Sequence, residues 1–189
     1  MNYKITVKQN EELTLPVIWT GEEAEINYDI SLSQIGAKIN FLMLLLGTKE
    51  NKVKINVHIV HEKPQTVSRV IVKGVLNDSS SVDFDGLVKI NKKSKLSNAW
   101  LAAHLLLLSD KAKGRAVPSL EILENDIKAG HATTVGKVND TEIFYLMSRG
   151  LNHKKAKQII IQGFLSGFLN EFPDGKIKQD ALRKVKYDI

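Results

Sequence analysis

The chain has 189 residues, of which 43% are hydrophobic and 25% charged, with a net charge of +6. That length suits one domain with a small addition, and that composition supports a buried core. There is no cysteine, which excludes disulfides, thiolate nucleophiles and zinc sites built on cysteine.

Two features favour a cytoplasmic protein without a membrane segment. The first fifteen residues lack the basic start and apolar run of a signal peptide. The longest apolar runs, 39–47 and 99–109, fall far short of the roughly 20 residues that span a bilayer.

The charge is unevenly distributed along the chain. Residues 1–30 are acidic, whereas residues 86–115 and the C-terminal segment are rich in lysine. Such asymmetry is typical of nucleic-acid binding, but no nucleic-acid module is recognisable, lysine outnumbers arginine, and few aromatics lie between the charges. We therefore expect a solvated basic face and no nucleic-acid partner.

Between residues 30 and 136 the sequence predicts a series of strands. Several stretches alternate apolar and polar residues, as Val53, Ile55, Val57 and Ile59 do, and period two is typical of half-buried strands. The run 99–109 also suits a helix, but its short length and the nearby Pro118 favour a buried strand containing His104. The predicted strands lie within 39–47, 53–60, 68–76, 81–90, 98–109, 116–123 and 126–136.

The spacing of these stretches favours a β-solenoid. Their centres recur about every 14 to 16 residues, whereas a meander of tight hairpins repeats at about 8 to 12. In a solenoid, each strand stacks on a strand of the next coil and the interior is continuous. The periodicity alone leaves a sandwich open as an alternative.

After Gly136 the period changes to that of helices. Asn139 and Glu142 form a capping box, Gly150 is placed to end that helix, and Asn152 begins a second one. The predicted apolar face of the second helix comprises Ala156, Ile159, Ile160, Gly163, Phe164, Gly167 and Phe168. We expect helices near 140–149 and 153–171, and a third is suggested after Gly175.

These patterns predict a β core over residues 1–137 and a helical C-terminal subdomain over 138–189. An array of stacked strands must be closed at its end, and an amphipathic helical pair provides that closure.

Three stretches carry a resemblance to a known family. They are "HEKPQTVSRVIVKGVLNDSSSVDFDGLVKI" (61–90), "LLLLSDKAKGRAVPSLEILENDIKAGHATTVG" (105–136) and "FYLMSRGL" (144–151). In order and spacing, across residues 32–172, they resemble the SufB/SufD family, the scaffold proteins of the SUF iron–sulfur cluster assembly system. The overall pattern is closer to SufD than to SufB.

The resemblance implies a right-handed parallel β-helix followed by a helical C-terminal part. It also implies a homodimer or a heterodimer with a SufB/SufD relative, and helices that dock a SufC-like ABC-type ATPase. The partner-binding candidates on these helices are Arg149, Phe164 and Phe168, flanked by basic residues that attract a partner electrostatically.

Two departures from the family pattern concern its chemistry. The chain is less than half the usual family length, and Ala129-Gly130-His131 stands where the family has a cysteine two residues before the histidine. Iron–sulfur clusters are normally held by thiolates, with histidine an occasional substitute. His131 is therefore the candidate ligand for a transient cluster shared with a partner, with Thr133 and Thr134 placed to orient it. Glu121, Glu124 and Asp126 lie upstream as possible neighbours.

The sequence predicts a protein that is not an enzyme. It has no P-loop, no glycine-rich dinucleotide turn and no Ser/His/Asp ordering. The expected function is a non-catalytic scaffold or partner subunit acting with the ATPase. Two alternatives remain at this point: a β-solenoid carbohydrate-binding protein or polysaccharide lyase using Asp83 and Asp85, and a structural partner that has lost cluster chemistry. His61, ahead of Thr66 and Ser68, is expected to pack in a turn.

Overall fold

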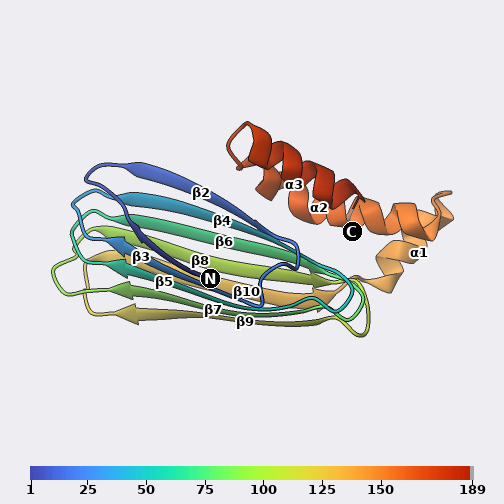
Figure 1. Ribbon diagram of the computed structural model, residues 1–189, viewed down its shortest axis with the longest axis horizontal. Helices are drawn as coiled ribbons and strands as arrows, with labels where there is room; N and C mark the ends of the chain where they lie inside the picture. Colours follow the sequence, from blue (N-terminus) through green and yellow to red (C-terminus); the bar gives the residue numbers. More distant parts are fainter. Residues whose placement is uncertain (188–189) are drawn as a thin grey trace.

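The computed structural model describes residues 1–187, which form ten strands followed by three helices (Figure 1). The last two residues of the predicted helical part, 188–189, lie outside the described residues. The strands are β1 (Asn2–Thr6), β2 (Glu12–Trp19), β3 (Glu25–Leu32), β4 (Lys38–Gly47), β5 (Lys52–His61), β6 (Val67–Leu76), β7 (Ser81–Ile90), β8 (Ser97–Leu107), β9 (Lys113–Ile122) and β10 (Ile127–Lys137). The helices are α1 (Asp140–Ser148), α2 (His153–Asn170) and α3 (Lys176–Tyr187).

The strands wind into a parallel β-helix with two sheets. The odd strands form one sheet in the order β1-β3-β5-β7-β9, and the even strands form the other in the order β10-β8-β6-β4-β2. All ladders are parallel, so each coil of the chain adds one strand to each sheet. The solenoid that the strand spacing predicts is therefore confirmed, including the assignment of residues 97–107 to a strand.

Alternation along each strand builds the interior. In β5 and β7 the burial alternates residue by residue, and the register sets Ile55 against Phe84 and Ile59 against Val88. These side chains point between the sheets and merge with those of β4, β6 and β8 into one apolar core. Apolar residues stacked in register exclude water from every coil, which is the main stabilisation of such a fold.

Three strands were missing from the sequence prediction. β1, β2 and β3 cover most of the acidic segment 1–30. In β3 the alternation was present, since Ile26, Tyr28, Ile30 and Leu32 are buried, but the intervening acidic and polar residues masked it. Charged residues on the outward face of a strand cost little, because that face is solvated.

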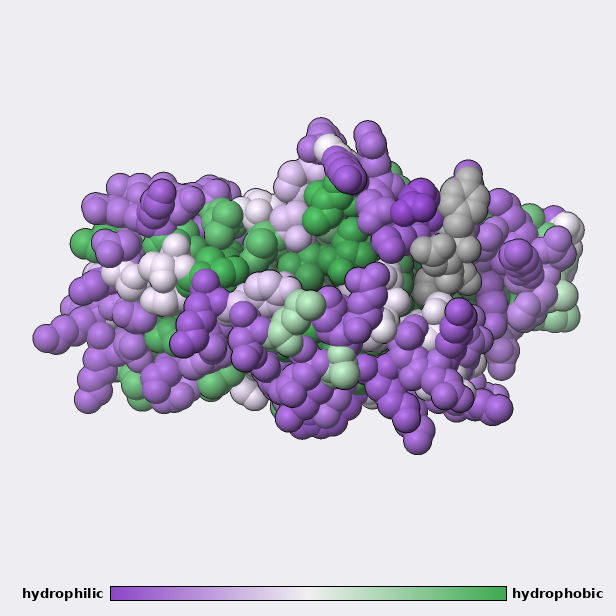
Figure 2. Space-filling view, viewed as in Figure 1, coloured by the Kyte–Doolittle hydropathy of each residue, from purple (hydrophilic) through white to green (hydrophobic). Residues whose placement is uncertain are grey.

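A second apolar core joins the helices to the outer face of the even-numbered sheet. Leu42, Leu44 and Ile71 on the strands pack with Leu165 and Phe168 on α2. Figure 2 shows hydrophilic residues over most of this view, with hydrophobic ones in its middle, beside the helices, and others on its left, over the strands.

Polar contacts reinforce this attachment. Arg69 on β6 forms a two-point ion pair with Glu171, with nitrogen–oxygen distances of 2.5 and 3.0 Å. Lys73 on the same strand donates to the Phe164 carbonyl at 2.5 Å, and its ammonium lies 4.5 Å from the Phe164 ring centroid. The α2 helix is thus held to β6 by both apolar packing and cations.

The buried face of α2 differs in phase from the predicted one. Its buried residues are Ala156, Ile161, Leu165, Phe168 and Leu169, while Gly163 and Gly167 are exposed. Isoleucine at three consecutive positions, 159 to 161, left the apolar stripe ambiguous in the sequence. The large apolar side chains decided the phase, because they bury more surface than glycine does.

Prolines occupy two edge strands of the β-helix. In β9, the amides of odd-numbered residues point to β7, as shown by Lys113 N donating to Ser80 O and Leu123 N to Ile90 O. Pro118 therefore stands where the amide would face the free edge. Pro16 occupies the equivalent position in β2, because Lys38 donates to the Glu11 carbonyl and odd-numbered residues of β2 face β4. These are positions where a missing donor costs no ladder hydrogen bond.

Within residues 1–187, no helix is both long and apolar enough to cross a membrane.

Candidate functional site

His131 lies near the middle of β10, the edge strand of the even-numbered sheet. The register sets it against Leu101, whose side chain is in the interior. The imidazole therefore points to the same side of the sheet as the core residues. However, β10 belongs to the last coil, and no further coil of the described residues covers the interior there. His131 is exposed as a result. The candidate ligand, His131, thus lies at the open end of the β-helix and is not buried in the core.

The backbone of β10 leaves a continuous row of hydrogen-bonding groups free. Val138 N donates to Leu107 O, so the even-numbered residues of β10 face β8. By strand alternation, the amides and carbonyls of Ala129, His131, Thr133, Val135 and Lys137 point the other way. No strand pairs with that side in the described part of the chain. Unlike β9, this edge contains no proline.

The two threonines after His131 bind other groups. The Thr133 hydroxyl donates to the Ala116 carbonyl of β9 at 3.5 Å, which bridges the two edge strands. Thr134, on the outer face, hydrogen-bonds His104 at 2.7 Å between Oγ1 and Nδ1. Burial, with a smaller contribution from the nearby Lys73 cation, lowers the pKa of His104. Neither threonine has a recorded hydrogen bond to His131.

Two of the three carboxylates upstream of His131, Glu121 and Glu124, have partners of their own. Glu121 pairs with Lys89 at 2.8 Å, and Glu124 accepts from the backbone amides of Lys93 and Asn125. Among the described residues, no group of three or more His, Asp or Glu side chains is placed to hold a metal ion. The donor set around His131 therefore does not fit a complete iron–sulfur site within one chain, since such clusters need several ligands.

Trp100 lies directly beside this edge. It is partly exposed on the outer face of β8, in register with Gly130. A Cβ at Gly130 would come within 2.6 Å of the indole ring, so only glycine leaves room for the ring to rest on the edge strand.

A second surface lies on α1. Phe144 is 72% exposed, and Tyr145 and Met147 are also exposed. The guanidinium carbon of Arg149, the C-cap residue, lies 5.2 Å from the centroid of the Tyr145 ring. An apolar hollow of about 450 Å³ separates Thr141, Glu142, Tyr145 and Leu146 of α1 from Ile160 of α2. Large exposed aromatics beside a hollow are typical of a protein–protein contact.

The two phenylalanines proposed from the sequence lie elsewhere. Phe168 is buried in the core under α2, in edge-to-face contact with Phe172. Phe164 is half-buried beneath the Lys73 ammonium. Both hold α2 to the β-helix. The aromatics on the surface, Phe144 and Tyr145, were part of the recognised "FYLMSRGL" stretch, and their side-by-side position on a nine-residue helix was the available signal.

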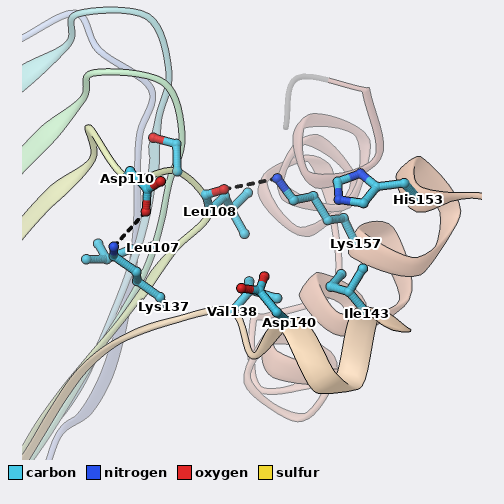
Figure 3. Close-up of a pocket in the computed structure, with 10 residues that line it drawn as sticks. Leu107, Leu108, Asp110, Lys137, Val138, Asp140, Ile143, His153 and Lys157 are labelled. Atoms are coloured by element: carbon cyan, nitrogen blue, oxygen red, sulfur yellow. Dashed lines mark hydrogen bonds and ion pairs between the residues drawn. The ribbon is translucent and has the colours of Figure 1, made fainter. Parts of the chain in front are cut away.

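The β-helix meets the helices at a small polar hollow of about 190 Å³ (Figure 3). Lys137 pairs with Asp110 at 2.7 Å on one side, and Lys157 of α2 donates to the Leu108 carbonyl at 3.0 Å. Asp140 and Ile143 of α1 and His153 of α2 complete the wall. These contacts join the end of β10 and the start of α2 to the same turn.

The remaining candidates have structural partners. His61 is fully buried, with Nδ1 2.8 Å from Thr66 Oγ1 and Nε2 2.7 Å from Ser68 Oγ, and burial lowers its pKa to about 4. It packs at a turn as the sequence suggested. Asp83 and Asp85 both pair with Arg115, so these carboxylates hold a cation of their own sheet.

The architecture is thus a parallel β-helix whose last coil ends in an open strand edge, followed by a helix with exposed aromatic side chains. The family model for the SUF system FeS cluster assembly SufBD core domain matches residues 2–164. The chain belongs to the SufB/SufD family, and its similarity lies on the SufD side of it.

Individual relatives agree with this assignment. The iron–sulfur cluster assembly protein SufD of Bacillus subtilis is 36% identical over 147 residues, covering 76% of this chain and 34% of the relative. A SufBD family protein of Mycobacterium tuberculosis is 28% identical over 171 residues, covering 90% of this chain and 18% of the relative. A Staphylococcus saprophyticus relative is 28% identical over 138 residues, or 73% of this chain and 30% of its own length. The chain thus spans about a third or less of the length of these relatives.

Proposed function

We propose that this chain is a non-catalytic subunit of an iron–sulfur cluster assembly complex. It pairs through β10 with another SufB/SufD chain and carries a SufC-like ABC-type ATPase on its helices. The observation that carries the proposal is the unbroken free edge of β10, with His131 at its centre. The chain belongs to a family of iron–sulfur cluster assembly proteins, which supports a role for this edge in that process.

The pairing surface is best supported by backbone hydrogen bonding. A partner strand laid beside β10 would satisfy the row of free amides and carbonyls, which is how an exposed edge binds a second chain. Pro118 deprives β9 of a central donor, so β10 is the better edge. Pairing would enclose His131 between two chains.

The cluster is cargo in this proposal and not a resident cofactor. His131 offers one imidazole nitrogen, and this chain has no thiolate to add. A transient cluster at this edge would require the partner chain to supply the remaining ligands. The proposal assigns no chemical step to this chain beyond presenting that nitrogen.

The ATPase surface is supported by the exposed face of α1. Phe144, Tyr145 and Met147 supply apolar contact area, and Arg149 adds a cation at its end. The α2 helix begins with His153, Lys154 and Lys155 and has no acidic residue in its first turn, so the flank is basic and favours a partner with acidic residues around its own contact.

Pairing through β10 is tested by comparing Thr133→Pro with Thr133→Val. Both substitutions remove the hydroxyl, but only proline removes the free amide, and neither breaks a bond to β8. We expect proline to weaken chain–chain association in sedimentation by more than about tenfold, roughly 1.4 kcal/mol. Valine should associate as the parent does. Equal association of the two variants would exclude pairing through this edge.

ATPase docking is tested by the double substitution Phe144→Ala, Tyr145→Ala. Leu182→Ala on α3 is the control, because Leu182 is a similarly exposed apolar residue away from α1. Calorimetry with the ATPase subunit of the same cell should show binding weakened by at least about tenfold for the double variant only. Undiminished binding would place the ATPase contact elsewhere.

A further inference from the structure

Helix α1 buries the fewest residues of the three helices. Within its residues 140–148, Ile143 is the only buried one. By contrast, α2 buries five residues and is also held by Lys73, Arg69 and Lys157. An element with so few buried contacts is expected to move at low cost.

Hollows lie on both sides of α1. The apolar one of about 450 Å³ separates Tyr145 and Leu146 from Ile160 of α2. The polar one of about 190 Å³ separates Asp140 and Ile143 from the turn after β8. Figure 3 shows Ile143 and Asp140 facing this second space from α1. The helix therefore has room to move, and it would bury some apolar surface by moving toward α2.

The ends of α1 are suited to such a movement. At its C-terminal end, Gly150 has a φ of +91°, and a Cβ there would meet nothing within 4 Å. Glycine in open space adopts many backbone conformations at similar energy. At the other end, Val138 is fixed by its hydrogen bond to Leu107, so the backbone change would fall at Asn139. Asn152 then caps α2 by accepting from the Lys155 amide, which fixes the far side of the pivot.

We propose that α1 is a hinged strap with two positions. The position described above leaves the apolar hollow open and presents Phe144, Tyr145 and Met147. In the second, α1 turns about its two ends, Asn139 and Gly150, and lays Tyr145 and Leu146 on Ile160, which fills the hollow. Closure hides part of the face assigned above to the ATPase, so the strap regulates that site. This regulatory role rests on the proposed function, whereas the movement does not.

The absence of cysteine makes the movement directly measurable. Spin labels on Ser148→Cys of α1 and Ser166→Cys of α2, both exposed positions, report the distance between the helices by double electron–electron resonance. We expect two distances in the isolated full chain. A control pair, Asn98→Cys on β8 with Ser166→Cys, joins two fixed elements and should give one. A single narrow distance for both pairs would overturn the proposal.

A second variant separates strap closure from fraying of α1. Ile160→Ser removes the surface that the closed strap covers, so the closed population should fall by about tenfold or more. Fraying would broaden the distribution and leave the populations unchanged by this substitution, which would contradict the proposal. Labels at Ser148→Cys and Asn170→Cys show whether the label at position 166 perturbs α2, because only the α2 label differs between the two pairs.

Adding the ATPase subunit tests separately whether α1 moves and whether that movement regulates ATPase binding. If α1 carries the ATPase contact, saturating ATPase should leave only the open distance, because the bound partner competes with closure. Two distances that do not respond to bound ATPase would support the strap and refute the assignment of the docking face.

Discussion

The β-helix and the helix that follows it use similar residues for opposite purposes. Phe41 and Phe84 are fully buried between the sheets, whereas Phe144 is 72% exposed, with Tyr145 exposed beside it. The β-helix repeats its register coil after coil, so the inward apolar side chains of the middle coils have neighbours above and below. Helix α1 has no such repeat and keeps its aromatics on the surface. The buried apolar surface is concentrated in the coils, and the exposed aromatic surface lies at their end.

The largest expected effect comes from removing an aromatic side chain in the coils. Phe41→Ala should lower the free energy of unfolding by about 3–5 kcal/mol, because a large cavity opens in a closely packed interior. Phe144→Ala is the matched control and should stay within about 0.5 kcal/mol of the parent. Denaturant titration measures both. Similar losses for the two variants would mean that α1 contributes to the core as the coils do.

Acid should weaken the coils through His61. The unfolded imidazole has a pKa near 6.5, and the buried one about 4, so the unfolded state binds the proton more readily. The contribution of neutral His61 is therefore complete above pH 6.5 and is lost as the pH falls toward 4, on the order of 3 kcal/mol in all.

His61→Asn removes this titration, at some cost in stability near neutral pH. The difference in unfolding free energy between parent and variant should shrink as the pH falls from 7 to 4.5. A constant difference across that range would show that His61 is not the acid-sensitive group.

The smallest effect is expected at the ion pair between β6 and α2. Arg69 and Glu171 are each more than a third exposed, so solvent screens their attraction, and Arg69→Met should cost about 1 kcal/mol or less. The loss should decrease further in 1 M salt, because the Debye length is then about 3 Å. An effect of several kcal/mol that resists salt would mean that the helices are held mainly by charge and not by their apolar core.

The sequence predicted the coils better than the site. Strict alternation in β5 and β7 fixes both the strands and their inward faces, since a shift by one residue would turn every apolar side chain outward. The same rule was available in β3, where acidic outward residues obscured it. Alternation carries no information about which edge stays unpaired, so the exposure of His131 followed only from the strand order.

For the helices, the sequence predicted where each one starts but not which face of α2 is buried. Caps at Asn139 and Asn152 gave their starts correctly, because capping is a local interaction. The phase of α2 depended on contacts with β4 and β6 far away in the sequence, and three adjacent isoleucines fit several phases. The hydrogen bond between His104 and Thr134 was likewise invisible, because it joins residues 30 positions apart that only the coil register brings together.

Pro16 and Pro118 also affect whether copies of this protein can stack end to end through their edge strands. They interrupt an edge of each sheet, at opposite ends of the stack of coils. A parallel β-helix with clean edges at both ends would template itself without limit and grow into fibrils. With β2 and β9 each lacking a central donor, end-to-end growth stalls. Of the two proline-free edge strands, β1 has only 5 residues, whereas β10 offers an uninterrupted row over 11. If the chain pairs through β10 as proposed, replacing both prolines with valine should make it prone to polymerise.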